Sequence, residues 1–293
     1  MRLRALAPGK VNLCLFLAGA RGDGRHELVT LFESVALADE LSMSPAEGAH
    51  DEVLCPGVEG PNLALAALEA LRGRGWDAPP VKVGIEKRIP IAAGMGGGSA
   101  DAAAVLRMAT ELAPGRPEEV AEIAALLGAD VPSQLAPGLV LGTGAGEIIE
   151  PVLPLAPHAL VIVPQRSPLS TADVYRQADL LGVPRDAGGL AGPLAELRDA
   201  LVPGRRLPAG LLVNELEPAA LSVCPAISDA LEAIRAAGAQ AFVCGSGPTA
   251  VGLYWGADGV DRARAAAVSL ATRFPGATST VPVPAEFGAP EFR

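Results

Sequence analysis

The stretch Ile89-Pro-Ile-Ala-Ala-Gly-Met-Gly-Gly-Gly-Ser-Ala-Asp101 lies between an expected strand and an expected helix. Apolar residues alternate over 81–86, as in a half-buried strand. An Ala-rich helix is expected over 99–112, with Ser99 or a neighbour near its N-cap and Asp101 in its first turn. Glycines let a backbone approach phosphate oxygens closely, and a helix N-terminus adds unpaired N–H groups and partial positive charge. The order strand, glycine loop, helix therefore favours an anion-binding site.

Two common phosphate-binding patterns do not fit these glycines. Walker A requires a Lys after its last Gly, and no Lys follows Gly98. The dinucleotide pattern G-x-G-x-x-G, started at Gly94, fails because Ser99 stands at its last position. A tight turn that only lets the helix pack on the strand is an alternative at this point, so the surrounding sequence has to decide.

Bulk properties limit the possible partners. The 293 residues suffice for two domains, half of them are apolar, and the net charge is −10 without any Lys/Arg run. Such a chain lacks the basic face that a nucleic-acid partner requires. No stretch approaches the ~18 apolar residues of a membrane span, and Pro8-Gly9-Lys10 interrupts the only segment that imitates a signal peptide. The four cysteines form no C-x-x-C motif, which favours free thiols and a cytoplasmic protein.

Periodicity and turn residues predict the remaining elements. Strands are expected over 3–18, with a turn at Pro8-Gly9, and over 30–43. A helix over 117–127 should end at a left-handed Gly128. The other expected helices cover 62–72, 193–201, 227–237 and 258–273, and the other expected strands cover 160–163, 240–243, 250–255 and 277–283.

The segment 89–104 resembles the P-x-x-x-G-L-G-S-S-S-A loop of the GHMP kinase superfamily, which includes galactokinase, homoserine kinase and mevalonate kinase. Its glycine run before Ser-Ala most resembles the diphosphocytidyl-methylerythritol kinase branch. Four other segments are similar to motifs of this branch: Ala7-Pro-Gly-Lys-Val-Asn-Leu-Cys-Leu15, Arg21-Gly-Asp-Gly-Arg-His-Glu-Leu28, Leu127-Gly-Ala-Asp-Val-Pro132 and Val243-Cys-Gly-Ser-Gly-Pro-Thr-Ala250. Taken singly, Lys10 would suit a solvated surface and Asp130 a turn, but together at this spacing they favour a functional interpretation.

The resemblance implies roles for particular residues. Asp130 would be the catalytic base, and Lys10 would stabilise charge on the moving phosphoryl group. The residues that would bind ATP are Asn62, Pro90, Ile91, Ala92, Ala93, Gly94, Met95, Gly96, Gly97, Gly98, Ser99 and Ala100, with Ser99 also near Mg²⁺. The residues that would hold the cytidine diphosphate end of the acceptor are Asn12, Arg25, His26, Tyr175, Gly245 and Ser246. Arg25 stands where this branch usually has Tyr, and its planar guanidinium could stack on the base instead.

The implied fold is α/β (α+β) with two domains. Residues 1–155 would form an N-terminal GHMP kinase domain with a left-handed βαβ unit, and residues 156–293 a ferredoxin-like C-terminal domain; the Pro-rich stretch 150–158 suits the boundary. The active site would lie in the cleft between them.

The implied reaction is the ATP-dependent phosphorylation of the 2-hydroxyl of 4-diphosphocytidyl-2-C-methyl-D-erythritol in the non-mevalonate isoprenoid pathway, with ATP and Mg²⁺ as cofactors. The expected partner is thus a small molecule carrying cytidine diphosphate, without nucleic acid or membrane, and the expected assembly is a monomer or weak homodimer. Two alternatives stay open: another GHMP kinase, such as a homoserine or mevalonate kinase, and a non-catalytic nucleotide sensor on the same fold. The segment Asp23-Gly-Arg-His26 argues against the first, and the presence of Lys10 and Asp130 argues against the second.

Overall fold

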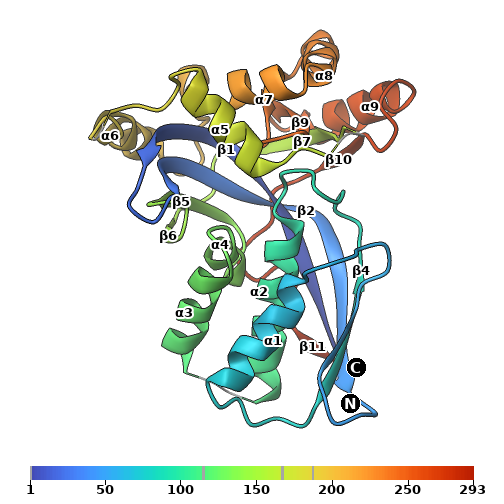
Figure 1. Cartoon of the computed structure of the whole chain (residues 1–293). Coiled ribbons are helices and arrows are strands. Elements are labelled where there is room, and N and C mark those ends of the chain that lie inside the picture. The colour runs from blue at the N-terminus through green and yellow to red at the C-terminus, as the bar shows by residue number, and fades with distance from the viewer. Residues whose placement is uncertain (1, 114–115, 166–167, 187) are drawn as a thin grey trace.

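Two long antiparallel strands run through the whole molecule. The computed structural model describes residues 2–113, 116–165, 168–186 and 188–293. In it β1 (Leu3–Ala20) pairs with β2 (His26–Pro45) over nearly their full length. Figure 1 shows this hairpin rising from the two chain termini towards the helices of the C-terminal half. Both halves of the chain are therefore built against the same pair of strands.

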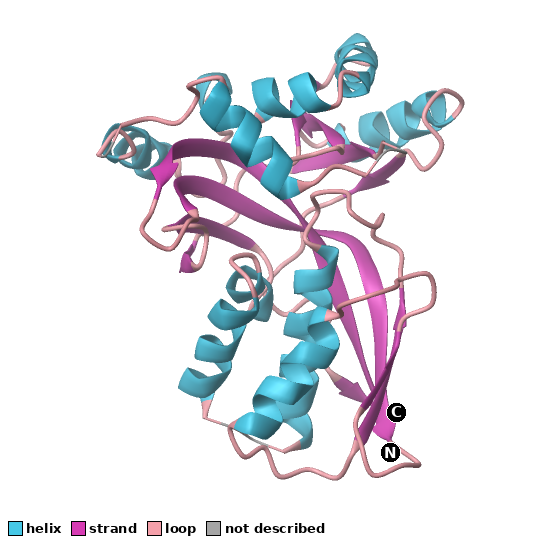
Figure 2. Ribbon diagram, viewed as in Figure 1, coloured by secondary structure: helices cyan, strands magenta, loops and turns pink. Residues whose placement is uncertain are grey.

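The first sheet has seven strands and carries helices on one face. Its main path has the order β11-β1-β2-β4-β3, and β5 joins the other end of β2 with β6 beside it. The remaining strands are β3 (Glu52–Leu54), β4 (Val81–Glu86), β5 (Leu139–Thr143), β6 (Ile148–Pro151) and β11 (Glu291–Phe292). The helices are α1 (Leu63–Gly73), α2 (Gly97–Leu112), α3 (Pro117–Leu127) and α4 (Val131–Leu135), and Figure 2 shows them gathered on one side of the strands.

Small residues let α2 approach the first sheet closely. Its buried face is mostly Ala, from Ala100 to Ala109, and it packs with Leu3, Ala5 and Leu68 in one hydrophobic cluster. Burial of this apolar surface is the main stabilising contribution here, at roughly 25 cal/mol per Å². Close packing of α2 also fixes its N-terminus, and therefore the glycine loop that precedes it.

The second sheet has the strand order of a ferredoxin-like domain. Its four strands run β10-β7-β9-β8, and every neighbouring pair is antiparallel. They are β7 (His158–Val163), β8 (Gln240–Val243), β9 (Ala250–Trp255) and β10 (Thr278–Thr280). The elements between them are α5 (Thr171–Leu180), α6 (Ala191–Ala200), a 3₁₀ turn (Ala209–Leu211), α7 (Glu217–Val223), α8 (Ala226–Ala236) and α9 (Gly259–Ala271). This split βαββαβ arrangement confirms the expected C-terminal fold.

Three local predictions are wrong. The chain does not turn at Pro8-Gly9: β1 continues, and a β-bulge there absorbs the proline, which has no N–H to donate. Helix α2 begins at Gly97 rather than Ser99, behind a left-handed Gly96 at the N-cap, so Asp101 lies beyond the first turn. Gly128 has φ 165°, which is extended rather than left-handed, because the chain passes directly into α4.

The other predicted elements are present, and several more appear that the sequence pattern does not predict. Helices α1, α3, α6, α8 and α9 and strands β4 and β7–β10 lie where periodicity places them, within a few residues. In the described chain the unpredicted elements are α4, α5, α7, the 3₁₀ turn, β3, β5, β6 and β11, and none exceeds ten residues. β11 brings the C-terminus back to pair with β1, and Val35 bridges to Pro282, so the last residues cross back to the first sheet. No helix in the described part of the chain is long and apolar enough to cross a membrane.

Candidate active site

Two cavities meet at the glycine loop. One, of about 350 Å³, lies on the side of α1 and β4, and the other, of about 330 Å³, lies between β1, β2, α5 and the loop after β8. Gly94, Gly96 and Ser99 line both cavities. A group held on one side of this loop is therefore adjacent to a group held on the other. Such a pair of cavities suits a transfer reaction between two ligands.

Lys10 occupies the wall of the second cavity. It lies in β1, is 4% exposed, and donates from Nζ to Asn12 Oδ1 at 2.9 Å and to the Gly94 carbonyl at 3.1 Å. Its Nζ also lies 3.4 Å from Asp130 Oδ2. Asn12 in turn donates to Thr30 Oγ1 at 2.8 Å, which fixes the amide orientation. The ammonium is therefore held by three partners from three separate segments.

Asp130 reaches the same cavity from the residue before α4. Its side chain is 33% exposed, whereas that of Lys10 is 5% exposed. The short helix α4 packs against α2 and α3, and Ser133 Oγ donates to the Asp130 carbonyl at 2.8 Å, so the backbone carrying the carboxylate is fixed. A positioned carboxylate open to a cavity, with a cation beside it, is suited to accept a proton from a bound hydroxyl.

The glycine loop requires glycine for steric reasons. Gly94 has φ +74°, and a Cβ on it would lie 2.6 Å from the Gly247 carbonyl oxygen. Gly96 has φ +68°, and its Cβ would lie 3.1 Å from Lys10 Cγ. Two glycine loops, 94–98 and 245–247, thus contact each other backbone to backbone. The Lys10 amide donates to the Met95 carbonyl at 2.9 Å, which ties the first loop to β1.

A buried ion triad lies beneath the nucleotide-side cavity and was missed from the sequence. Lys87 Nζ contacts Asp39 Oδ2 at 2.5 Å and Asp101 Oδ2 at 2.7 Å, and Asp39 Oδ1 accepts from the amides of Arg88 and Ile89. Burial raises the pKa of Asp101 to about 7, Lys87 opposes this shift, and Asp39 adds to it. Burial also works to lower the Lys87 pKa, but the two carboxylates outweigh it and raise that pKa. The triad joins β2, the end of β4 and α2.

Asn62 lies at the entrance of α1. Its side chain accepts from the Ala64 amide at 2.8 Å as the helix N-cap, and the residue lines the nucleotide-side cavity together with the loop residues from Pro90 to Ser99. Cys55 and Lys87 line it too. The structure therefore brings together nearly all residues that the resemblance assigned to ATP; of that set, all of which the structure describes, only buried Ala100 does not line the cavity.

The acceptor-side cavity combines hydroxyls with two aromatic rings, those of Phe32 and Tyr175. Tyr175 and Thr171 come from α5, and Gly245 and Ser246 from the loop after β8. The Thr171 and Ser246 hydroxyls lie 3.0 Å apart. Burial, and secondarily the charge of Asp130, raise the pKa of Tyr175, so its hydroxyl stays protonated. Thr171 was not singled out from the sequence, although the Ser-Thr-Ala-Asp start of α5 is a recognisable N-cap signal.

Two residues assigned to the base end of the acceptor do not line this cavity. His26 is buried behind Tyr175, with ring centroids 5.0 Å apart, and its Nε2 lies 2.7 Å from Asp179 Oδ1. Arg25 is exposed and its Nε pairs with Asp23 at 3.2 Å. A part in substrate binding for either residue remains a prediction.

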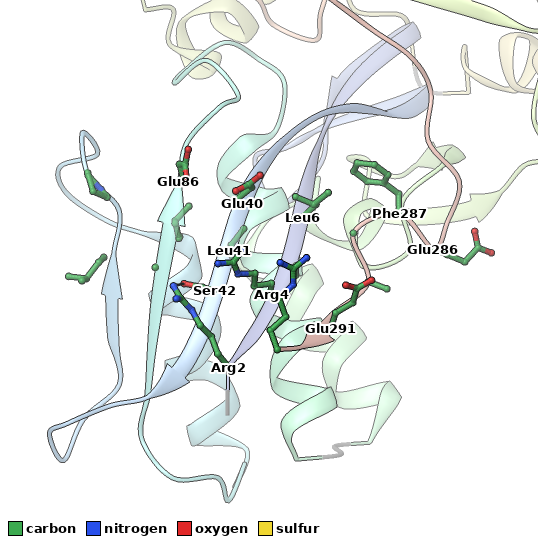
Figure 3. Close-up of a pocket in the computed structure, with 18 residues that line it drawn as sticks. Arg2, Arg4, Leu6, Glu40, Leu41, Ser42, Glu86, Glu286, Phe287 and Glu291 are labelled. Atoms are coloured by element: carbon green, nitrogen blue, oxygen red, sulfur yellow. Dashed lines mark hydrogen bonds between the residues drawn. The ribbon is translucent and has the colours of Figure 1, made fainter.

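A larger cavity, of about 690 Å³, lies far from these groups on the helix-free face of the first sheet. Figure 3 shows Arg2 and Arg4 projecting there beside Glu40 and Glu291, with helices behind the strands. Acidic and basic side chains are intermixed, and neither Lys10 nor Asp130 borders it. Size alone therefore does not identify the reaction site, whereas the smaller paired cavities hold the groups suited to chemistry.

Known proteins resemble this chain in sequence and in fold. Residues 62–138 match the N-terminal domain of GHMP kinases, and residues 194–270 match their C-terminal domain. The chain is 40% identical over 285 residues to the 4-diphosphocytidyl-2-C-methyl-D-erythritol kinase of Streptomyces avermitilis, covering 93% of this chain and 94% of the relative. It is 41% identical over 257 residues to the enzyme of that name in Mycobacterium bovis, covering 83% and 79%.

Solved structures agree. A crystal structure of 4-(cytidine 5'-diphospho)-2C-methyl-D-erythritol kinase superposes with a TM-score of 0.74 at 31% identity, covering 95% of this chain and 98% of that one. A homoserine kinase from Cytophaga hutchinsonii shares the fold, with a TM-score of 0.68 at 17% identity over 99% of this chain and 96% of that one. Fold and paired cavities thus define a two-domain GHMP kinase. Within that class, the chain belongs to the 4-diphosphocytidyl-2-C-methyl-D-erythritol kinase family.

Proposed function

We propose that the protein transfers the γ-phosphoryl group of ATP to the 2-hydroxyl of 4-diphosphocytidyl-2-C-methyl-D-erythritol, a step of the non-mevalonate isoprenoid pathway. The observation that carries the proposal is the pair Lys10 and Asp130, 3.4 Å apart at the point where two cavities share a glycine loop. ATP is the donor expected of a GHMP kinase. The names of the relatives supply the acceptor.

In this proposal Asp130 orients the acceptor hydroxyl and takes its proton as the phosphoryl group moves. A positioned base of this kind contributes typically ~10²–10⁴ in rate. Lys10 neutralises charge that develops on the transferred group, and its contacts with Asn12 and the Gly94 carbonyl hold the ammonium in place beforehand. Phosphoryl transfer depends mainly on such positioning and charge stabilisation.

The glycine loop holds the donor phosphates through backbone N–H groups and the N-terminus of α2. The residues around it also suit Mg²⁺, because this ion is usually bound by one or two protein oxygens together with substrate phosphates. The Ser99 hydroxyl borders both cavities and is the group that would serve. When bound, the ion would neutralise phosphate charge. Within the described residues no cluster of three His, Cys, Asp or Glu side chains forms a separate metal site.

On the acceptor side, Asn12, Tyr175, Gly245 and Ser246 would surround the cytidine diphosphate end. The ring of Tyr175 offers a flat apolar surface, and the Ser246 hydroxyl and the glycine amides offer hydrogen-bond donors to phosphate. His26 and Arg25 would contribute only if the base extends beyond the cavity, or if these side chains move on binding.

A substrate panel tests the proposal directly. Purified protein, Mg-ATP and one acceptor at a time are mixed, and ADP release is followed with the cytidylyl compound, homoserine and mevalonate. We expect ADP only with the cytidylyl compound, and phosphorus NMR should place the new phosphate on the 2-hydroxyl. ADP with homoserine or mevalonate alone would indicate another GHMP kinase, and no acceptor-dependent ADP would favour a nucleotide sensor.

A further inference from the structure

Two side chains of helix α5, in the C-terminal half, contact a histidine of the first sheet. Tyr175 and Asp179 are four residues apart, so they lie on the same face of α5, one turn from each other. His26, at the start of β2, meets both: its ring lies 5.0 Å from the Tyr175 ring, and its Nε2 lies 2.7 Å from Asp179 Oδ1. The His26 side chain is 8% exposed and that of Asp179 is 50% exposed.

We propose that Asp179 is a positioning residue for the acceptor, acting through His26 on the Tyr175 wall of the acceptor-side cavity. The proposal rests on the proposed function, because it assigns the base end of that acceptor to this wall. Asp179 itself does not border the cavity, whereas Tyr175 does. Its effect therefore passes through the histidine that lies between the carboxylate and the aromatic ring.

The hydrogen bond to Asp179 fixes which nitrogen of the His26 ring carries a proton, and how the ring is oriented. A carboxylate oxygen can only accept, so Nε2 must carry a proton and donate it. Asp179 thereby selects the Nε2–H form and prevents the ring from turning over. A ring held in one orientation presents one face to Tyr175, so the tyrosine ring keeps a constant place in the wall of the cavity.

The same contact joins the two halves of the molecule at the cavity. His26 belongs to β2, which brings Leu28 and Phe32 to the cavity, and α5 brings Thr171 and Tyr175. Loss of the Asp179 carboxylate would loosen α5 against β2 on the acceptor side only. Among the described residues, none from α5 or from the start of β2 lines the nucleotide-side cavity, so ATP binding should not change.

Kinetics of three variants test the proposal. In Asp179→Ala we expect KM for the cytidylyl acceptor to rise about five- to tenfold, the size of one charge-assisted hydrogen bond partly open to solvent. Turnover (kcat) and KM for ATP should change by less than about twofold, because the lost interaction would stabilise the bound acceptor and the transition state equally. Asp179→Asn keeps a side-chain oxygen that can accept from Nε2–H, so most of the acceptor affinity should return. Asp173→Ala is the matched control, since Asp173 lies on the same helix, is 49% exposed, and pairs with Arg176.

Nitrogen NMR of the His26 ring tests the same contact without turnover. The chain has three histidines, so His26→Gln assigns the signal. We expect the Nε2–H form in the wild-type protein and a mixture of forms in Asp179→Ala. A wild-type His26 in the Nδ1–H form, an unchanged KM in Asp179→Ala, or equal KM effects in Asp179→Ala and Asp173→Ala would each overturn the proposal. If the wild-type protein does not phosphorylate the cytidylyl compound, the proposed function fails, and the NMR result still decides whether Asp179 orients His26.

Discussion

Lys10 Nζ lies 3.4 Å from Asp130 Oδ2, although one residue comes from the first strand and the other from the loop before α4. The glycine loop lies beside this pair, with the Gly94 carbonyl 3.1 Å from the same ammonium. The cation therefore contacts both the proposed base and the loop proposed to hold the donor. Charge on a phosphoryl group passing between the two cavities would develop next to Lys10.

Asp130→Asn should abolish most turnover without unfolding the protein. The amide cannot take a proton, and we expect kcat to fall by ~10²–10⁴. Because the carboxylate is 33% exposed and the glycine loop does not depend on it, KM for ATP should change little. Steady-state kinetics with circular dichroism of the same samples check this. Near-normal kcat in a folded variant would exclude Asp130 as the base.

Sequence motifs predicted which residues meet at this cavity, because each of these residues lies in a short segment with a recognisable local pattern. Lys10, Asn12 and Asp130 are each recognisable within a few neighbours, and the structure brings all three to one cavity. Contacts between distant side chains carry no such local signal. The pairing of Lys87 with Asp39 and that of His26 with Asp179 depend on how β2 meets the loop before α2 and on how it meets α5, which no window of sequence specifies.

Secondary structure was predictable where apolar residues recur at a regular spacing along the sequence. It was not predictable where tertiary contacts determine whether a segment forms a helix or a strand. Helix α1 buries Ala64, Ala67, Leu68 and Leu71, which recur at the spacing of one helix face. Helix α5 buries only Val174 and Ala178 fully, so few apolar residues mark its buried face in the sequence. Strand β1 passes straight through Pro8 because the bulge and the pairing with β2 outweigh the local turn signal.

Gly94→Ala should displace the glycine loop. Alanine is strained at φ +74°, and its Cβ would lie 2.6 Å from the Gly247 carbonyl oxygen and 2.7 Å from that of Cys244, which are backbone atoms that cannot yield easily. We expect the positive φ alone to cost roughly 1 kcal/mol of folding stability, the clash to add to this, and KM for ATP to rise about tenfold or more as the loop moves. Urea unfolding and ATP titration measure the two effects.

Gly24→Ala is the matched control for this substitution. Gly24 has φ +81°, but a Cβ on it would meet no atom within 4 Å. It should show only the cost of the positive φ and leave KM for ATP unchanged. Equal losses of stability and of ATP affinity in the two variants would mean that contact between the glycine loops is unimportant.

Asp101→Asn should change how stability depends on pH. Burial raises the pKa of Asp101 to about 7 in the folded protein, above its usual value of 3.8. The folded state thus favours the protonated form, so this contribution to stability is present below about pH 4 and is lost as the pH rises through 7. Asparagine carries no charge at any pH, so the variant should gain stability relative to the wild-type protein between pH 4.5 and 8.

Urea midpoints of both proteins at several pH values measure this difference. Asp199→Asn, on the exposed face of α6, provides a control in which the two curves should run parallel. Parallel curves for Asp101→Asn would show that the carboxyl is not protonated preferentially in the folded protein.

His158 and Glu33 form a buried pair between the two sheets. His158 opens β7, Glu33 lies in β2, and their Nε2 and Oε2 atoms are 2.7 Å apart. The other ring nitrogen, Nδ1, lies 2.8 Å from the Ala156 carbonyl, so both nitrogens face acceptors and the ring is satisfied as an imidazolium. The Trp255 ring, 4.7 Å away, covers it, and Glu33 is the charged group that acts on it.

Replacing this pair by the neutral double variant Glu33→Gln/His158→Gln should remove a pH-dependent share of stability. Burial works to lower the His158 pKa, but the Glu33 carboxylate and the Ala156 carbonyl outweigh it and raise that pKa. A raised histidine pKa stabilises the folded state fully below the unfolded value near 6.5, and this stabilisation is lost as the pH rises through the folded value. The free energy of unfolding of the wild-type protein should therefore exceed that of the double variant most at pH 6 and least at pH 9. This difference should change by about 1.4 kcal/mol for each tenfold difference in proton affinity between the folded and unfolded states.

Denaturant midpoints at pH 6, 7.5 and 9 measure this difference, with His50→Gln, at an exposed position, as the control that should show no such trend. A difference that stays constant, or that grows with pH, would mean that the pair is not held as imidazolium and carboxylate.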